Sequence, residues 1–200
     1  MPSSPWDAAA AYAMRAATSL ADDPALPLQT LELTGLKAPR REDRWNMEER
    51  NILLYDGMAT FMVVSDDTVQ IECEVTMYQK NSWGMADPSY LDVQTPAILG
   101  YWRYAVRSRI TQKFPRHKLA DDGTRYGLGQ AIVTPSVIRA ELIALHGELE
   151  EKGLLENLKT FKEGLIVERN KDDRNRLDVL APPDLVNKFR VFAMQTRFIL

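Results

Sequence analysis

Residues 134–153 read Thr-Pro-Ser-Val-Ile-Arg-Ala-Glu-Leu-Ile-Ala-Leu-His-Gly-Glu-Leu-Glu-Glu-Lys-Gly, and they carry a strong helix pattern in a chain of 200 residues. Thr134 is a favourable N-cap, Pro135 suits the first helical turn, and Gly153 is a natural stop. The apolar side chains that recur at helical spacing are Ile138, Leu142, Leu145 and Leu149. The pattern therefore predicts an amphipathic helix that buries this stripe in a core.

A second helix is predicted on the N-terminal side, from about Thr95 to Phe114, and Pro115 ends it. Its apolar stripe consists of Leu99, Trp102, Val106 and Ile110. A shorter helix is predicted from Met47 to Tyr55. An alanine-rich helix is predicted from Trp6 to Leu20.

The long helix carries arginines beside its apolar stripe, and no acidic residue lies between Arg103 and Lys118. At 100° per residue, Arg103 and Arg107 lie along one border of the stripe and Arg109 along the other. Guanidinium groups bind carboxylates bidentately, so these three residues are candidates for contact with an acidic protein surface. Pairing with the Asp and Glu residues of the same chain is the alternative.

Two β-hairpins are predicted, one from residues 60–64 and 69–77 and the other from residues 165–169 and 177–180. In the strand 69–77, apolar Val69, Ile71 and Val75 alternate with Gln70, Glu72 and Glu74. This alternation is typical of a strand with one buried and one exposed face.

Residues Asn187–Leu200 read as a further strand that ends on Arg-Phe-Ile-Leu. Such a strand offers backbone donors and acceptors that pair either within its own sheet or with the sheet of a neighbour. The side chains expected to support sheet pairing and core contact are Phe189, Val191, Phe192, Met194, Phe198 and Ile199. Assembly is therefore the first hypothesis for function, and the sequence leaves the choice between the two kinds of pairing open.

The composition argues against several classes of partner. The net charge of -3 and the pI near 5.5 give no reason to expect binding to nucleic acid or to an anionic membrane. No run approaches the ~20 apolar residues that span a bilayer, and the N-terminus lacks the regions of a signal peptide. The single Cys73 cannot form a disulfide within the chain and is interpreted as a buried, inert thiol rather than a reactive one.

The residues that usually carry catalysis are sparse. His117 and His146 have no metal-site spacing, and His146 is interpreted as an ordinary packed histidine. Gly123, Gly127 and Gly129 lack the pattern of a phosphate-binding loop, so a turn with positive φ is the better interpretation. We therefore predict no catalytic residue, no metal ligand and no cofactor, and the chain is not expected to be an enzyme.

The predicted fold is α+β, with a small mixed or antiparallel sheet made of the two hairpins and a C-terminal strand, covered by several helices. Three regions are expected along the chain. Residues 1–44 form an N-terminal helix and an extended proline-containing segment, residues 45–186 form an α+β domain, and residues 187–200 form a terminal strand or arm.

Several motifs in order are similar to those of a known family: Pro115–Gly127, Gly129–Pro135, Asn51–Gly57, Ser89–Val93, Leu165–Arg169 and Pro182–Asn187. Together they resemble the C-terminal part of the tail sheath protein of Mu-like contractile-tailed phages, from about Pro5 to Leu200. Full-length members of that family carry a further N-terminal region, so the resemblance implies a fragment or a truncated copy.

The resemblance implies a structural subunit in the inner, tube-proximal layer of a contractile sheath, which self-assembles around the tail tube and contracts to drive the tube through the host envelope. Terminal arms would add strands to neighbouring subunits and link stacked hexameric rings. The implied partners are other sheath subunits, the tail tube protein and the baseplate, without nucleic acid or membrane insertion. The implied location is the virion tail, after assembly in the cytoplasm of the bacterial host. A non-polymerising tail or baseplate adaptor, which binds one partner through the basic helix, is the alternative.

Overall fold

Capping residues set the start of two helices in the chain, of which the computed structural model describes residues 2–199. At α1 (Pro5–Asp22) the Ser4 hydroxyl accepts a hydrogen bond from the Asp7 N–H. At α2 (Met47–Tyr55) Asn46 and Glu49 form a reciprocal capping box. Both predicted helices are confirmed.

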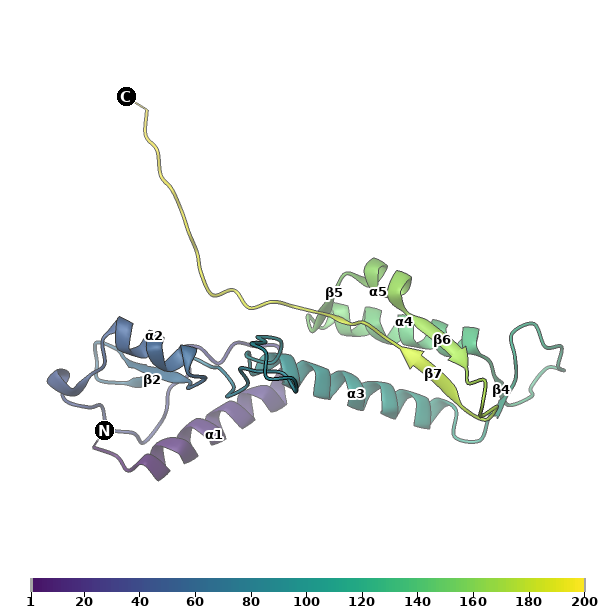
Figure 1. The fold of residues 1–200 in the computed structure, drawn as a ribbon, viewed down its shortest axis with the longest axis horizontal. Coiled ribbons are helices and arrows are strands. Elements are labelled where there is room, and N and C mark those ends of the chain that lie inside the picture. The colour runs from purple at the N-terminus through teal and green to yellow at the C-terminus, as the bar shows by residue number, and fades with distance from the viewer. Residues whose placement is uncertain (1, 200) are drawn as a thin grey trace.

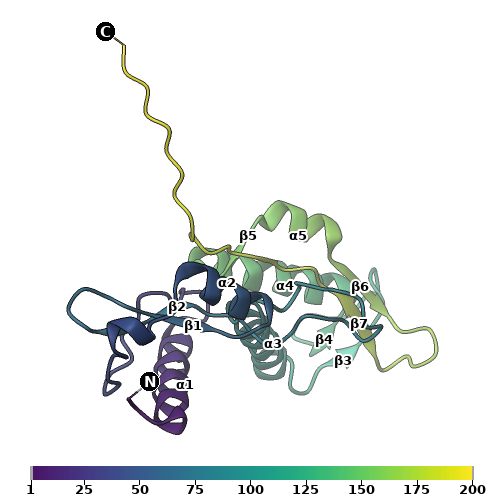
Figure 2. The same ribbon diagram turned by 60° about the vertical axis from the view of Figure 1, so that its left-hand side comes forward.

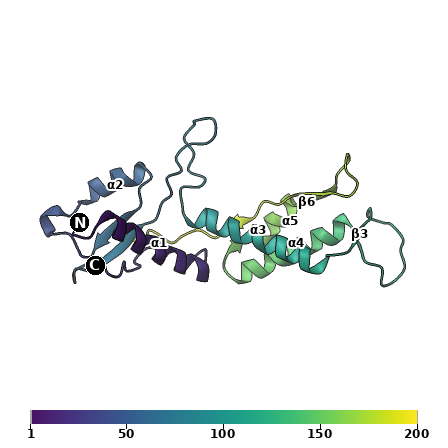
Figure 3. The same ribbon diagram turned by 90° about the horizontal axis from the view of Figure 1, so that it is seen from below.

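The described residues form two lobes of an elongated molecule, and α3 (Gln94–Lys113) begins where the lobes meet and runs along the C-terminal lobe (Figures 1 and 3). The N-terminal lobe contains α1, α2, the short 3₁₀ helix η1 (Arg41–Asp43), β1 (Thr60–Val63) and β2 (Val69–Cys73). The C-terminal lobe contains β3 (Lys118–Leu119), β4 (Ile132–Val133), α4 (Pro135–Glu151), β5 (Leu155–Glu156), α5 (Leu158–Gly164), β6 (Ile166–Arg169), β7 (Leu177–Leu180) and β8 (Asp184–Leu185). The two predicted hairpins therefore lie in different lobes.

The core of the C-terminal lobe forms around α4. Its predicted stripe is entirely buried: Ile138, Leu142, Leu145 and Leu149. Trp102 of α3 and Phe161 of α5 complete this cluster, with their rings 5.7 Å apart in an edge-on contact. On α3 the buried apolar positions are Ile98 and Trp102, so the stripe begins one residue before the predicted Leu99, and Gln94 in the first turn is also buried.

His146 lies inside this aromatic core with no exposed surface. Its ring stacks on Phe161 at 4.2 Å, and within residues 2–199 neither ring nitrogen has a hydrogen-bond partner. Burial lowers the pKa of His146, so the native imidazole is neutral. The interpretation of His146 as a packed histidine is confirmed.

The N-terminal lobe is built on β2, which is paired along both edges. The β1–β2 hairpin is antiparallel, with Phe61 opposite Ile71. On the other edge the proline-bearing segment after α1 pairs with β2, because Thr30 and Leu33 donate to the carbonyls of Ile71 and Val69, each at 2.8 Å. The buried side chains of this smaller core are Leu28, Leu33, Val69 and Ile71.

The strands form four separate two-stranded ladders. The ladders β1–β2, β5–β8 and β6–β7 are antiparallel, and β3–β4 is parallel. The α+β class and both hairpins are confirmed, but the hairpins do not share one sheet, because α3 carries them into different lobes. The expected C-terminal strand is not formed in the single chain: residues 187–199 pair with no other described strand, and a strand requires a partner edge.

His146 generates a prediction about pH. The unfolded imidazole takes up a proton as the pH falls through about 6.5, whereas the folded one resists protonation. The free energy of unfolding should therefore be highest above that pH and should decrease as the pH falls toward the lower folded pKa. His146→Leu should remove this part of the decrease, measured by urea unfolding at about pH 7.5 and about pH 5.5.

Leu142→Ala is the matched control in the same core. It should lower the free energy of unfolding by about 3 kcal/mol at both pH values, because it opens a cavity without removing a titrating group. If His146→Leu and the unsubstituted chain lost the same stability between the two pH values, burial of a neutral His146 would not explain the effect.

Candidate interaction site: the C-terminal arm and its root

The root of the C-terminal arm crosses from one lobe to the other. On the C-terminal lobe β8 pairs with β5, placing Leu185 opposite Leu155. Val186 then donates its N–H to the Leu154 carbonyl at 3.3 Å. Lys188, three residues after β8, contacts the N-terminal lobe. The segment Asp184–Arg190, which we call the arm root, therefore touches both lobes.

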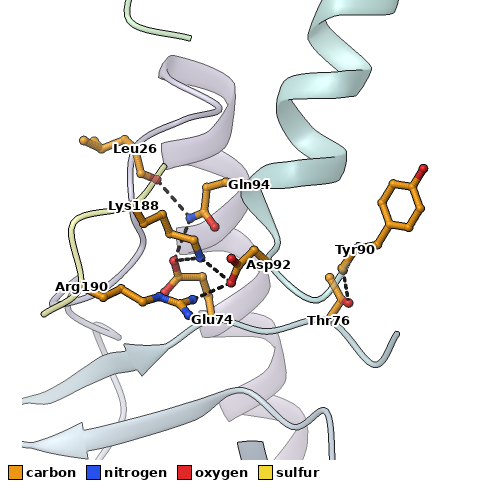
Figure 4. Close-up of polar contacts among 8 residues, drawn as sticks. All are labelled: Leu26, Glu74, Thr76, Tyr90, Asp92, Gln94, Lys188 and Arg190. Carbon is orange, nitrogen blue, oxygen red and sulfur yellow. Dashed lines mark hydrogen bonds and ion pairs between the residues drawn. The ribbon is translucent and has the colours of Figure 1, made fainter. Parts of the chain in front are cut away.

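The contact with the N-terminal lobe is a buried ion pair (Figure 4). The Lys188 Nζ lies 2.8 Å from Glu74 Oε1 and 3.1 Å from Asp92 Oδ1. The Lys188 and Glu74 side chains are only 7% and 2% exposed. Because neither charge reaches water freely, each depends on the other for compensation.

Further hydrogen bonds connect this ion pair to three segments of the chain. The Gln94 amide, in the first turn of α3, donates to Glu74 Oε1 at 2.9 Å and to the Leu26 carbonyl at 3.3 Å. Arg190 binds Asp92 at 2.7 Å. We call Glu74, Asp92, Gln94, Lys188 and Arg190 the root cluster; it joins the end of β2, the start of α3 and the loop after α1 to the arm root (Figure 4).

Tyr12 of α1 lies beside the root cluster and stays neutral. Burial, followed by the nearby Glu74 carboxylate, raises the pKa of the Tyr12 hydroxyl. The half-buried Cys73 thiol also has a raised pKa, chiefly because of burial, so the thiolate is disfavoured. Neither Tyr12 nor Cys73 is therefore an activated nucleophile. The charges of the root cluster attach the arm root to the N-terminal lobe.

Beyond the root cluster the arm extends away from both lobes (Figures 1 and 2). The apolar side chains expected to pair or pack are between 73% and 99% exposed: Phe189, Val191, Phe192, Met194, Phe198 and Ile199. An extended segment with this much apolar surface is typical of a partner-binding element.

The three candidate arginines of α3 have different surroundings. Arg109 binds Glu141 at 2.8 Å and also binds Glu148, both on α4. Arg109 is therefore paired within the chain, and its hydrogen bond to Glu148 lowers the pKa of that carboxyl group. Arg103 and Arg107 are exposed and form no ion pair within residues 2–199. Among the described residues of α3, these two arginines are therefore available to a partner.

The structure adds residues that sequence reasoning missed. Glu74 was assigned to the exposed face by extending the alternation of β2, but β2 ends at Cys73, and Glu74 turns inward. Lys188 and Glu74 are 114 positions apart, so no local pattern connects them. The one sequence signal for the arm root is the pair of basic residues, Lys188 and Arg190, near the start of an otherwise apolar arm.

The glycine loop between α3 and α4 agrees in part with expectation. Gly123 and Gly129 have φ angles of +82° and +76°, which confirms a turn that favours glycine, whereas Gly127 is not in this conformation.

In residues 2–199 no group of three or more His, Cys, Asp or Glu side chains is arranged to hold a metal. None of the described helices is both long and apolar enough to cross a membrane.

Comparison with known proteins assigns the class. A family model described as the phage tail sheath protein central domain matches residues 2–77, and one described as the phage tail sheath C-terminal domain matches residues 85–199. The chain belongs to the phage tail sheath protein family. It is 54% identical over 192 residues to the Mu-like prophage FluMu tail sheath protein of Haemophilus influenzae, covering 96% of this chain and 39% of that protein. The chain thus spans well under half of the length of this relative.

Solved structures share the fold at low sequence identity. A sheath tail protein from Listeria innocua has a TM-score of 0.61 at 14% identity, over 82% of this chain and 36% of that one. A chain of the anti-feeding prophage baseplate has a TM-score of 0.60 at 9% identity, over 92% of this chain and 48% of that one. The contracted helical sheath of the same particle gives 0.58 at 10% identity, over 87% and 45%. The arrangement described above is therefore a sheath fold.

The exposed arm leads to a proteolysis prediction. Trypsin should cut after Arg197 first and after Arg190 next, because unpaired extended segments fit a protease site better than helices do. A chain that ends at Arg190 should keep its free energy of unfolding within about 0.5 kcal/mol, since the removed side chains are exposed. Mass spectrometry of the fragments and urea unfolding of the shortened chain would measure both quantities.

Arg103 and Arg107 provide the internal control, because they are equally basic but lie within α3. Cleavage after Arg197 that is no faster than cleavage in α3, or a large loss of stability on removing the arm, would show that the arm packs on its own chain in solution.

Proposed function

We propose that this chain is part of a structural subunit of a contractile phage tail sheath, which self-assembles around the tail tube through its C-terminal arm. The observation that carries the proposal is the arm at residues 191–199, whose apolar side chains are exposed and whose backbone pairs with no described strand. In water such a segment gains by adding to the edge of another sheet, where main-chain hydrogen bonds supply affinity and side chains supply specificity.

The β6–β7 ladder offers edges to which such an arm can add. It has two strands, so its outer backbone edges are unpaired within the described chain. Apolar side chains are exposed on it, including Ile166, Val179 and Leu180 at 47%, 45% and 63%. The arm leaves the molecule in a direction that takes it away from the β6–β7 ladder of the same chain (Figure 1). This arrangement favours pairing of the arm with the ladder of another copy over pairing within one chain.

The proposed action is mechanical. Subunits move as rigid bodies from an extended to a contracted packing, while exchanged strands keep them connected. The partners are other sheath subunits in hexameric rings, the tail tube protein and the baseplate, and the location is the virion tail after assembly in the host cytoplasm. We infer a structural rather than a catalytic role, without a cofactor, nucleic acid or membrane insertion.

The first test removes the arm but keeps its root. Truncation after Arg190, made in the sheath protein that carries this chain, should abolish tubes seen by negative-stain electron microscopy while the subunit remains folded. Normal tubes after this truncation would overturn the proposal, and an unsubstituted protein that never forms tubes would favour a non-polymerising adaptor.

Proline substitutions separate backbone pairing from side-chain contact. Proline removes a backbone donor, and alternate N–H groups of a strand point toward the partner edge. At least one of Ala193→Pro and Met194→Pro should therefore block tube formation, whereas Met194→Ala should retain it. Equal assembly of all three variants would exclude strand addition as the mode of contact.

The free arginines of α3 support a second contact. We propose that Arg103 and Arg107, together with the exposed Tyr104, face an acidic surface of the tail tube or of an adjacent subunit, and that Arg109 supports them through its hold on α4.

The double variant Arg103→Glu/Arg107→Glu should weaken docking of the sheath protein on purified tubes. The defect should be largest at low salt, because exposed charges are screened over about 10 Å at 0.1 M salt. Arg116→Glu, an exposed basic residue beyond the end of α3, is the control for charge alone. Co-sedimentation across a salt series measures the effect, and equal docking of the double variant and the unsubstituted protein would remove these residues from the contact.

A further inference from the structure

The arm root holds two lobes at once. Its first part is fixed to the C-terminal lobe by the β5–β8 ladder and by a hydrogen bond from Asn187 to Glu156 at 3.4 Å. Its second part is fixed to the N-terminal lobe by Lys188 and Arg190. The two attachments meet at adjacent residues, Asn187 and Lys188, so the root is too short to absorb a change in the angle between the lobes.

The attachment to the N-terminal lobe is hard to break. Separating Lys188 from Glu74 would leave two charges with almost no access to water, and an uncompensated buried charge is strongly unfavourable. Asp92 is more exposed and belongs to the segment just before α3, the helix that begins where the lobes meet. The ion pair therefore acts at the junction where the lobes would bend.

The attachments end abruptly at Arg190. Within the described chain, no hydrogen bond or ion pair involves a side chain of residues 191–199. A chain that is fixed at Arg190 and free at Val191 bends most easily between these two residues.

We propose that the Glu74–Lys188–Asp92 cluster staples the two lobes through the arm root, fixing the angle between the lobes and making the arm pivot at Val191. If the arm adds to a neighbouring subunit, as the proposed function requires, a pull on the arm reaches the lobe junction directly. The β5–β8 ladder, with two residues per strand, is then shielded from that pull.

The staple can be tested on the chain itself, without assembly. In a Cys73→Ser background, spin labels at Tyr55→Cys on α2 and Glu151→Cys on α4 report the distance between the lobes by pulsed electron paramagnetic resonance. The stapled chain should give a narrow distance distribution. Single labels at Phe189→Cys and Met194→Cys should give restricted and free motion, respectively, because they lie on opposite sides of the pivot.

The variant Glu74→Gln/Lys188→Met removes both charges of the pair, so it leaves no unpaired buried charge that would unfold the lobe. Its circular dichroism should match that of the parent chain. Its interlobe distribution should broaden, and the label at residue 189 should lose its restricted signal. Lys188→Met alone should show the same changes together with a loss of stability.

Arg190→Gln is the matched control, because it removes a cation that binds the same Asp92 from a position that is 36% exposed. It should leave the interlobe distribution narrow, since Lys188 and Glu74 remain paired. An interlobe distribution that stays narrow in the double variant would overturn the staple, as would a label at residue 189 that is already mobile in the parent. Neither result bears on whether the arm builds tubes, so failure of the staple is distinguishable from failure of the proposed function.

Discussion

A β-strand is complete only when a second backbone edge satisfies its donors and acceptors, and within the described residues the C-terminal arm pairs with no such edge. The side chains of the arm are apolar, its backbone is extended, and the last described ladder of the chain ends at Leu185. The same chain displays a two-stranded ladder, β6–β7, with unpaired edges. These two features are complementary, and they are the basis of the proposal that the arm pairs with a neighbouring subunit.

Electrostatics gives this flexible element a defined starting point. The buried ion pair between Lys188 and Glu74 lies where the arm leaves the molecule. Together with the hydrogen bonds of Gln94, it connects the arm root to the end of β2, to α3 and to the loop after α1. If the arm joins neighbouring subunits as proposed, it must transmit displacement between them, and an arm without a fixed attachment would transmit little. The combination of a fixed root and a free end satisfies both needs.

Much of the local structure followed from sequence pattern. The helical stripe Ile138–Leu149 correctly predicted α4 and the C-terminal core because periodicity is a local property. Thr134 occupies the predicted N-cap position, but its side chain makes no capping hydrogen bond. The packed state of His146 followed from the same stripe. Glu74 was placed wrongly because alternation applies only as far as the strand continues, and β2 ends one residue earlier.

The sequence alone determined the elements, the absence of recognisable catalytic motifs and the apolar, extended character of the arm, since these depend on residues close together in the chain. Only the tertiary structure decided that the two hairpins lie in separate lobes. It also decided that Arg109 forms ion pairs with α4, whereas Arg103 and Arg107 form none within the described residues. Only the tertiary structure joined Lys188 to Glu74 and left the arm unpaired beyond them. The physical reason is that ion pairs and strand edges form between groups distant in sequence, so they depend on where the folded backbone carries each group.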